Sequence, residues 1–117
     1  MLAAFLDDIR DGDVIAPKRM ADRLRLPMTR LSKLAHLNRN TMAARPGSPA
    51  VQAKLGEIAR IIARAAEMAG DEGRAIIWFK HQPIPGFGNR TAEQMVEDGH
   101  AAAVMWTLES MEQGVHA

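Results

Sequence analysis

Apolar residues recur at intervals of three and four along most of the chain, which is the spacing of one face of an α-helix. The longest such segment begins at Ser48 and Pro49, a pair typical of a helix N-terminus, and stops at Gly70, a typical C-terminal residue. Its apolar stripe consists of Val51, Leu55, Ile58, Ile62, Ala65 and Ala69. Because no alternating β-branched segment is long enough for a strand, the pattern predicts an all-α fold.

Turn and cap residues divide the first 47 residues into shorter predicted helices. Gly12 stops the first, and Pro17 suits the first turn of the second because its missing N–H needs no partner there. Thr29 and Asn38 are expected N-caps, and no helix can continue through Pro46. The predicted helices cover about residues 2–10, 17–25, 29–36 and 39–45.

The C-terminal part is predicted to hold three more helices around one irregular loop. Asp71 opens the first, and the loop over residues 82–89 follows with two prolines and two glycines, which forbid regular structure. Thr91 and Gln94 have the spacing of a capping box for a helix that stops near Gly99. The last helix, over about residues 100–113, has Val104, Leu108 and Met111 on one side.

Charge divides the chain into two unlike parts. Residues 17–54 contain nine Lys or Arg against one acid, a local net charge of +8. Residues 55–117 contain five bases and nine acids, a net of −4, so the total of +1 conceals a dipolar layout. The basic part is suited to a polyanion and the acidic part to a different partner.

The basic part also has the pattern of a helix-turn-helix over residues 29–45. Such a unit needs a small residue where its helices cross, apolar residues on both sides of the turn, and a polar start to the second helix. Ser32 is the small residue, and His36 stands in the turn, where glycine is usual. The packing set is Leu31, Leu34, Ala35, Leu37 and Met42, and the polar start is Asn38, Arg39, Asn40 and Thr41.

If this head enters the major groove of DNA, donor geometry assigns the contacts. Arg39 suits a bidentate contact to guanine and Asn40 one to adenine, each worth about 1–3 kcal/mol of discrimination. Phosphate contacts are expected from Lys18, Arg19, Arg30, Lys33 and Arg45. The alternative is a solvated basic face on which the asparagines serve only as helix caps.

Other chemistries fail on inspection. Without cysteine, disulfides and the common structural zinc sites are excluded. The segment DDIRDGD would put Ile9 and Lys18 at ligand positions of a calcium loop, and the four histidines lack metal-site spacing. We therefore expect no metal ion, cofactor or catalytic residue. The first residues lack a basic region and a cleavage-like site, and no apolar run could span a membrane, so we expect a cytoplasmic protein.

The C-terminal third holds four of the five aromatic residues: Trp78, Phe79, Phe87 and Trp106. They are either core anchors or part of a binding surface. The run RAIIWFKHQPIPGFGNRTAEQMVEDGHAAAV with the terminal EQGVHA resembles the toxin-binding domain of the MbcA/ParS/Xre antitoxins. Residues 30–61 are similar to the helix-turn-helix half of the Xre-type members. The matching C-terminal positions are Gly88, Thr91, Ala92, Glu93, Gly99 and Gly114, although proline is common at the position of Ala92 and an aromatic at that of His116.

The resemblance implies a non-enzymatic type II antitoxin that covers the NAD⁺ pocket of a RES-domain toxin and binds its own promoter. We expect a homodimer, because helix-turn-helix proteins usually read paired half-sites. We also expect three regions, with DNA binding in 1–47, a connecting helix in 48–70 and toxin binding in 71–117. The implied toxin contacts are the loop residues Phe87, Gly88 and Asn89 and the terminal residues Gly114, Val115, His116 and Ala117 with the free carboxylate. The alternative is a stand-alone regulator whose C-terminal domain only dimerises or senses a ligand.

Overall fold

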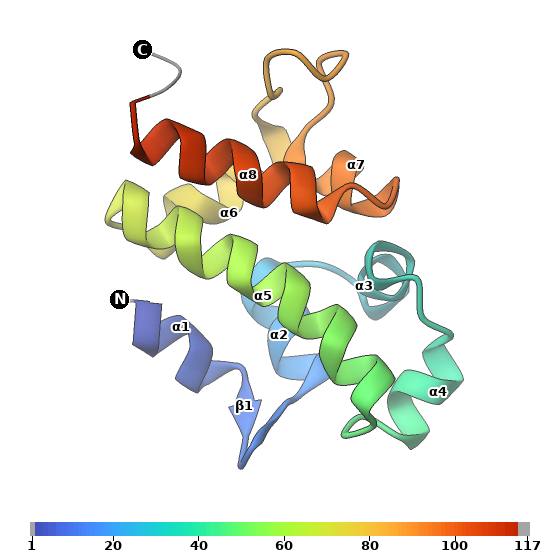
Figure 1. Ribbon diagram of the computed structural model, residues 1–117. Helices are drawn as coiled ribbons and strands as arrows, with labels where there is room; N and C mark the ends of the chain where they lie inside the picture. Colours follow the sequence, from blue (N-terminus) through green and yellow to red (C-terminus); the bar gives the residue numbers. More distant parts are fainter. Residues whose placement is uncertain (1, 115–117) are drawn as a thin grey trace.

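The computed structural model describes residues 2–114, and over this range the chain forms eight helices and one short β-hairpin (Figure 1). The all-α prediction is confirmed, apart from the hairpin. The elements are α1 (Leu2–Asp8), β1 (Arg10–Asp11), β2 (Val14–Ile15), α2 (Pro17–Leu24), α3 (Met28–Ala35), α4 (Arg39–Ala44), α5 (Pro49–Ala69), α6 (Glu72–His81), α7 (Ala92–Glu97) and α8 (Ala101–Glu112).

Most helix ends follow from local capping. The Ser48 hydroxyl accepts a hydrogen bond from the Val51 N–H at 3.3 Å, and α5 ends at Gly70 in the left-handed conformation, with φ of 73°. Before α7, the Thr91 hydroxyl and the Gln94 side chain each accept the other's backbone N–H, which completes the predicted capping box. These ends confirm the predictions because a cap depends only on residues two or three positions away.

Two predictions for the N-terminal part are wrong. Thr29 is not an N-cap: α3 begins one residue earlier with Pro27 at its cap position, and the Thr29 carbonyl accepts the Ser32 hydroxyl within the helix. The first helix ends at Asp8 and not at residue 10, because the chain turns into the hairpin β1–β2. The side chain of Gln52 on α5 holds this hairpin by accepting from the Ile15 N–H and donating to the Ile15 carbonyl, at 2.8 and 2.9 Å.

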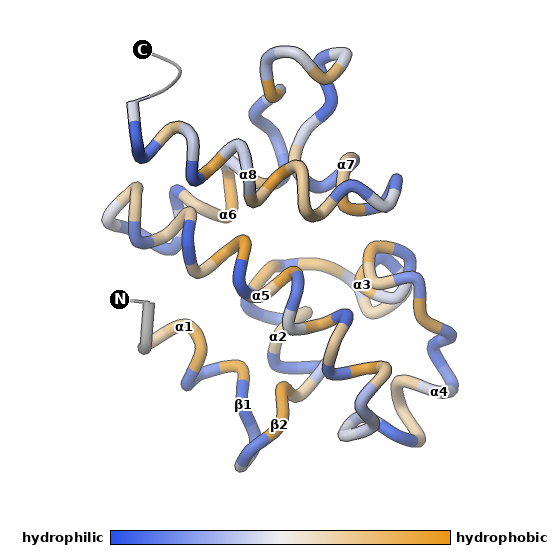
Figure 2. Tube along the Cα trace, viewed as in Figure 1, coloured by the Kyte–Doolittle hydropathy of each residue, from blue (hydrophilic) through white to orange (hydrophobic). Residues whose placement is uncertain are grey.

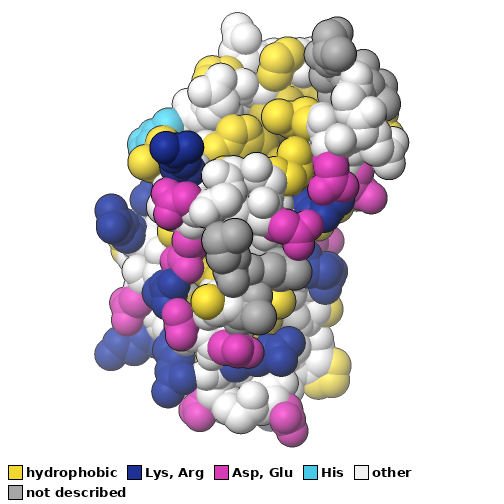
Figure 3. All heavy atoms as spheres, turned by 90° about the vertical axis from the view of Figure 1, so that its left-hand side faces the viewer, with side chains coloured by type: hydrophobic (Ala, Val, Ile, Leu, Met, Phe, Trp, Pro, Cys, Tyr) yellow, Lys and Arg dark blue, Asp and Glu magenta, His cyan; other side chains and the backbone are white. Residues whose placement is uncertain are grey.

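The fold buries most of the apolar side chains but leaves some of them exposed to solvent. Figure 2 shows hydrophobic positions recurring between polar ones along α5 and α8. On α8, Val104 and Leu108 are buried as predicted, but Met111 is 45% exposed. Figure 3 views the molecule from the left of Figure 1 and shows hydrophobic side chains gathered on the upper part of that face. None of the helices described is long and apolar enough to cross a bilayer.

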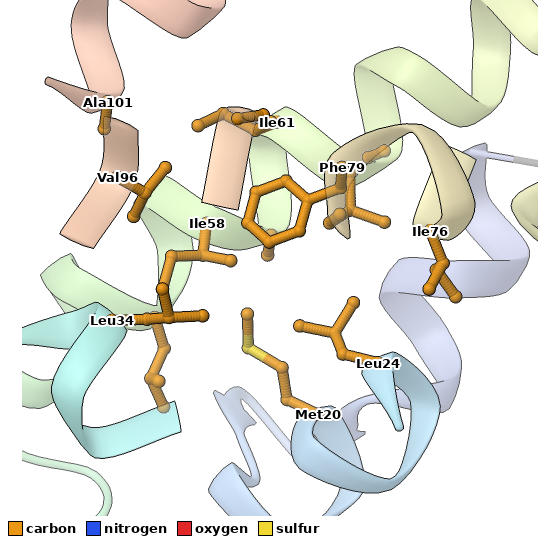
Figure 4. Packing of buried hydrophobic residues seen from close by; sticks show 14 of the residues in the cluster. Met20, Leu24, Leu34, Ile58, Ile61, Ile76, Phe79, Val96 and Ala101 are labelled. Atoms are coloured by element: carbon orange, nitrogen blue, oxygen red, sulfur yellow. The ribbon is translucent and has the colours of Figure 1, made fainter. Parts of the chain in front are cut away.

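The buried residues form one cluster that extends from Phe5 on α1 to Leu108 on α8. Helix α5 is its centre, because it packs against α1, α3, α6, α8 and β2. In Figure 4, Phe79 of α6 points toward Ile58 of α5 and toward Met20 of α2. The core therefore continues across all three of the predicted regions.

Candidate functional site

Helices α3 and α4 form the predicted helix-turn-helix. The chain leaves α3 through His36, whose φ of 55° lies in the left-handed region that glycine normally occupies. Around this turn, the packing residues Leu31, Leu34, Ala35 and Met42 are buried, as is Ser32, and Leu37 is partly buried. The packing set read from the sequence is therefore confirmed.

The polar head of α4 is exposed. The Asn38 side chain accepts hydrogen bonds from the N–H groups of Asn40 and Thr41, at 2.8 and 3.3 Å, so it acts as the N-cap. Beyond this cap, the side chains of Arg39, Asn40 and Thr41 project into solvent. Lys33 and Arg45 are exposed as well, and neither forms an ion pair with any residue of the described range 2–114.

Arg30 differs from the other predicted DNA contacts because its charge is already paired. Its Nε lies 2.7 Å from Glu93 Oε2, and a second guanidinium nitrogen lies 2.8 Å from Glu97 Oε1. Burial alone lowers the pKa of Arg30, but the hydrogen bonds to Glu93 and Glu97 outweigh burial and leave the pKa raised. Arg30 therefore joins α3 to α7 rather than standing free on the surface.

A second contact between the two halves is made by α2. The Arg23 side chain pairs with Glu72 at the start of α6 and with Asp8 at the end of α1. Its pKa is raised, first by the hydrogen bond to Glu72 and then by the one to Asp8. The Lys80 ammonium of α6 donates to backbone carbonyls at the end of α2, at 3.2 and 3.3 Å. The helix-turn-helix and the C-terminal helices are thus held in one arrangement.

Hydrogen bonds and one ion pair hold the loop between α6 and α7 in its conformation. Ile84 is buried, and its N–H donates to the Arg90 carbonyl at 2.9 Å. The Arg90 guanidinium in turn donates to the Phe87 carbonyl at 3.0 Å and pairs with Asp98 at 2.9 Å. Phe87 is half-buried against the core, while Gly88 and Asn89 are exposed in left-handed conformations, with φ of 67° and 62°. The loop therefore exposes the backbone of Gly88 and Asn89 and part of the Phe87 side chain to solvent.

The end of α8 is the other predicted toxin contact. Gly114 is exposed and left-handed, and its N–H donates to the Met111 carbonyl at 3.1 Å. Val115, His116 and Ala117 lie outside the described residues. The loop and α8 both lie at the end of the molecule away from α4 (Figure 1). A partner on these segments would therefore leave α4 accessible.

The four aromatic residues divide between core and surface. Phe79 is fully buried, Trp78 is half-buried at the edge of the core, and Trp106 is 56% exposed. Trp106 is therefore not a core anchor. Among the described residues, no group of three His, Asp or Glu side chains lies close enough to hold a metal ion. Trp78 lines an apolar groove between α5, α6 and α8, and the sequence did not predict this groove.

Comparison with known proteins identifies the C-terminal part. Residues 64–114 match the family model of the antitoxin Xre/MbcA/ParS C-terminal toxin-binding domain. The match runs from the last turns of α5 to the second residue after α8 and includes the loop between α6 and α7. Neither a curated protein nor a solved structure matches the chain. The resemblance noted in the sequence is thus confirmed for the C-terminal part, where residues 64–114 match the toxin-binding domain of the Xre/MbcA/ParS antitoxins.

Proposed function

We propose that this chain is a non-enzymatic cytoplasmic antitoxin that neutralises a RES-domain, NAD⁺-degrading toxin and represses its own operon. The observation that carries the proposal is the match of residues 64–114 to an antitoxin toxin-binding domain. The toxin class follows from the resemblance to Xre-type antitoxins. The bound antitoxin covers the toxin's NAD⁺ pocket, so neutralisation is stoichiometric and needs no catalytic group.

The toxin contacts are assigned to the loop around Phe87 and to the terminal residues after Gly114. A short tail with a free carboxylate suits a cationic cleft that binds a pyrophosphate. The loop supplies the adjoining wall, with Gly88 and Asn89 exposed beside the half-buried Phe87. An aromatic side chain that is already partly ordered loses little conformational freedom on binding, which favours its use as an anchor.

Operator binding is assigned to the head of α4. Arg39 and Asn40 read base edges, and Lys33 and Arg45 contact phosphates, whereas Arg30 is omitted because it is paired with Glu93 and Glu97. Thr41 and the capping Asn38 lie next to the major groove of the bound DNA. Because helix-turn-helix proteins usually read paired half-sites, the chain binds its operator as a homodimer.

A truncation tests the toxin assignment. A purified RES-domain protein is incubated with NAD⁺ and with either the full-length chain or a chain ending at Glu112. We expect the full-length chain to stop NAD⁺ loss at a fixed molar ratio and the truncated chain to fail. The truncation keeps every residue of α8, so its circular dichroism should be unchanged.

Two outcomes of this assay count against the proposal. NAD⁺ consumption that continues in the presence of the full-length chain would remove the antitoxin role toward RES toxins. Equal protection by the full-length and truncated chains would remove only the role of the tail.

A further inference from the structure

An apolar groove of about 350 Å³ lies on the face of the toxin-binding domain where α5, α6 and α8 meet. Residues at the end of α5, on α6 and in the second half of α8 line it. Its lining consists of Ala65, Met68, Ala69, Arg74, Ala75, Trp78, Leu108 and Met111. The groove belongs to the face that Figure 3 shows, where hydrophobic side chains gather in the upper part.

An ion pair joins two of the helices that line the groove. The Arg64 guanidinium on α5 pairs with Glu112 in the last turn of α8, the residue after Met111. Arg64 also pairs with Glu67 at 2.6 Å. A preformed groove lowers the entropic cost of binding. Met111 has a flexible side chain, so the lining of the groove can adjust to the shape of an inserted side chain.

One charge marks the rim. Arg74 is exposed, and its side chain has no hydrogen bond or ion pair with any residue between 2 and 114. It therefore differs from Arg64 and Arg90 of the same domain, which are both paired. Beside it, Ile77 is 62% exposed and extends the apolar surface beyond the groove. A partner that fits this face has an apolar side chain next to a carboxylate.

We propose that the occupant of this groove is an apolar segment of the toxin, with an acidic side chain that pairs with Arg74; this inference rests on the proposed antitoxin function. All eight lining residues lie within the matched toxin-binding domain. Two of the helices that line the groove also lead to the proposed toxin contacts, since the loop around Phe87 follows α6 and Gly114 follows α8. A toxin that contacts both segments therefore meets helices that line the groove.

Two substitutions on α8 test the inference. Met111→Glu places a charge in the groove, and its control, Ala102→Glu, places the same charge at an exposed position of the same helix. The two positions are nine residues apart, about 180° around the helix, and Ala102 does not line the groove. Binding of each full-length variant to the purified RES-domain protein is measured by calorimetry. We expect Met111→Glu to raise the Kd at least about tenfold and Ala102→Glu to leave it nearly unchanged.

A third variant, Arg74→Glu, tests the charge at the edge of the groove. It changes an exposed side chain and leaves the apolar lining of the groove intact. Because Arg74 is exposed and unpaired, reversing its charge should leave the urea unfolding midpoint unchanged and weaken toxin binding. Sedimentation of the free wild-type chain and of each variant reports whether a second copy fills the groove instead.

The outcomes separate the inference from the function on which it rests. If the wild-type chain does not bind the RES-domain protein, the proposed function fails. If the wild type binds but Met111→Glu and Arg74→Glu bind equally well, only the groove inference is overturned. It is also overturned if Ala102→Glu weakens binding as much as Met111→Glu does, or if Met111→Glu converts a dimer into a monomer.

Discussion

The guanidinium of Arg30 on α3 lies 2.7 Å from a carboxylate oxygen of Glu93 on α7, and this pair joins the helix-turn-helix to the toxin-binding domain. Glu97, one turn further along α7, takes a second nitrogen of the same guanidinium. The Glu93 side chain is only 14% exposed, so the pair is largely shielded from solvent. A basic residue that the charge pattern assigned to DNA is therefore a contact between the two halves of the chain.

Arg30→Ala should lower the free energy of unfolding by about 1–3 kcal/mol, because it leaves the shielded Glu93 carboxylate without a charged partner. Urea unfolding measures the change. A double-mutant cycle with Glu93→Ala should give a coupling of at least about 0.5 kcal/mol. The matched control is Arg90→Ala, whose partner Asp98 is more exposed, and it should cost less. Equal losses for the two arginines would contradict the structural role of Arg30.

His36→Gly should stabilise the chain by about 1 kcal/mol, because a left-handed conformation is strained for residues with a Cβ and not for glycine. The control replaces a left-handed glycine at the end of another helix by a residue that has a Cβ. Gly70→Ala meets no atom within 4 Å, so backbone strain alone should destabilise the chain by about 1 kcal/mol. Thermal unfolding measures both variants, and shifts of the same sign would show that backbone strain does not decide these ends.

Phe79→Ala should destabilise the chain by about 3–5 kcal/mol, because Phe79 of α6 is fully buried and faces α2 and α5. Ile77→Ala, two residues earlier on the same helix, should change stability by less than about 0.5 kcal/mol because Ile77 is 62% exposed. Urea denaturation of both variants gives the comparison. A small loss for Phe79→Ala would mean that the core is not centred where α5 and α6 meet.

Arg39→Ala should weaken binding to a fragment of the chain's own promoter by about 1–3 kcal/mol and relax sequence preference at one base pair. Lys33→Ala should reduce the slope of log affinity against log salt by about 0.9, because one phosphate contact is lost. Fluorescence anisotropy at several salt concentrations measures both effects. Arg74→Ala, on the toxin-binding domain, is the control, and an unchanged affinity of Arg39→Ala would exclude recognition through α4.

Features that depend on neighbouring residues could be predicted from the chain alone. The caps at Ser48, Asn38 and Thr91 are in place because each hydrogen bond joins residues two or three positions apart. The left-handed turn at His36 and the apolar stripe of α5 follow from the same short range. The C-terminal family could be identified for a related reason, since its motif is a compact run of residues around one loop.

Tertiary structure decided whatever depends on residues that meet from distant positions. Arg30 is 63 positions from Glu93, and the hairpin at Ile15 exists because Gln52, 37 positions away, satisfies its backbone groups. The groove at Met111 likewise requires three helices to come together. Helical periodicity marks which residues are apolar, but only packing determines which of them the core covers. The sequence by itself therefore determined the helices, most of their ends and the binding-domain family, while the fold decided which charges are paired and which apolar surface is open to a partner.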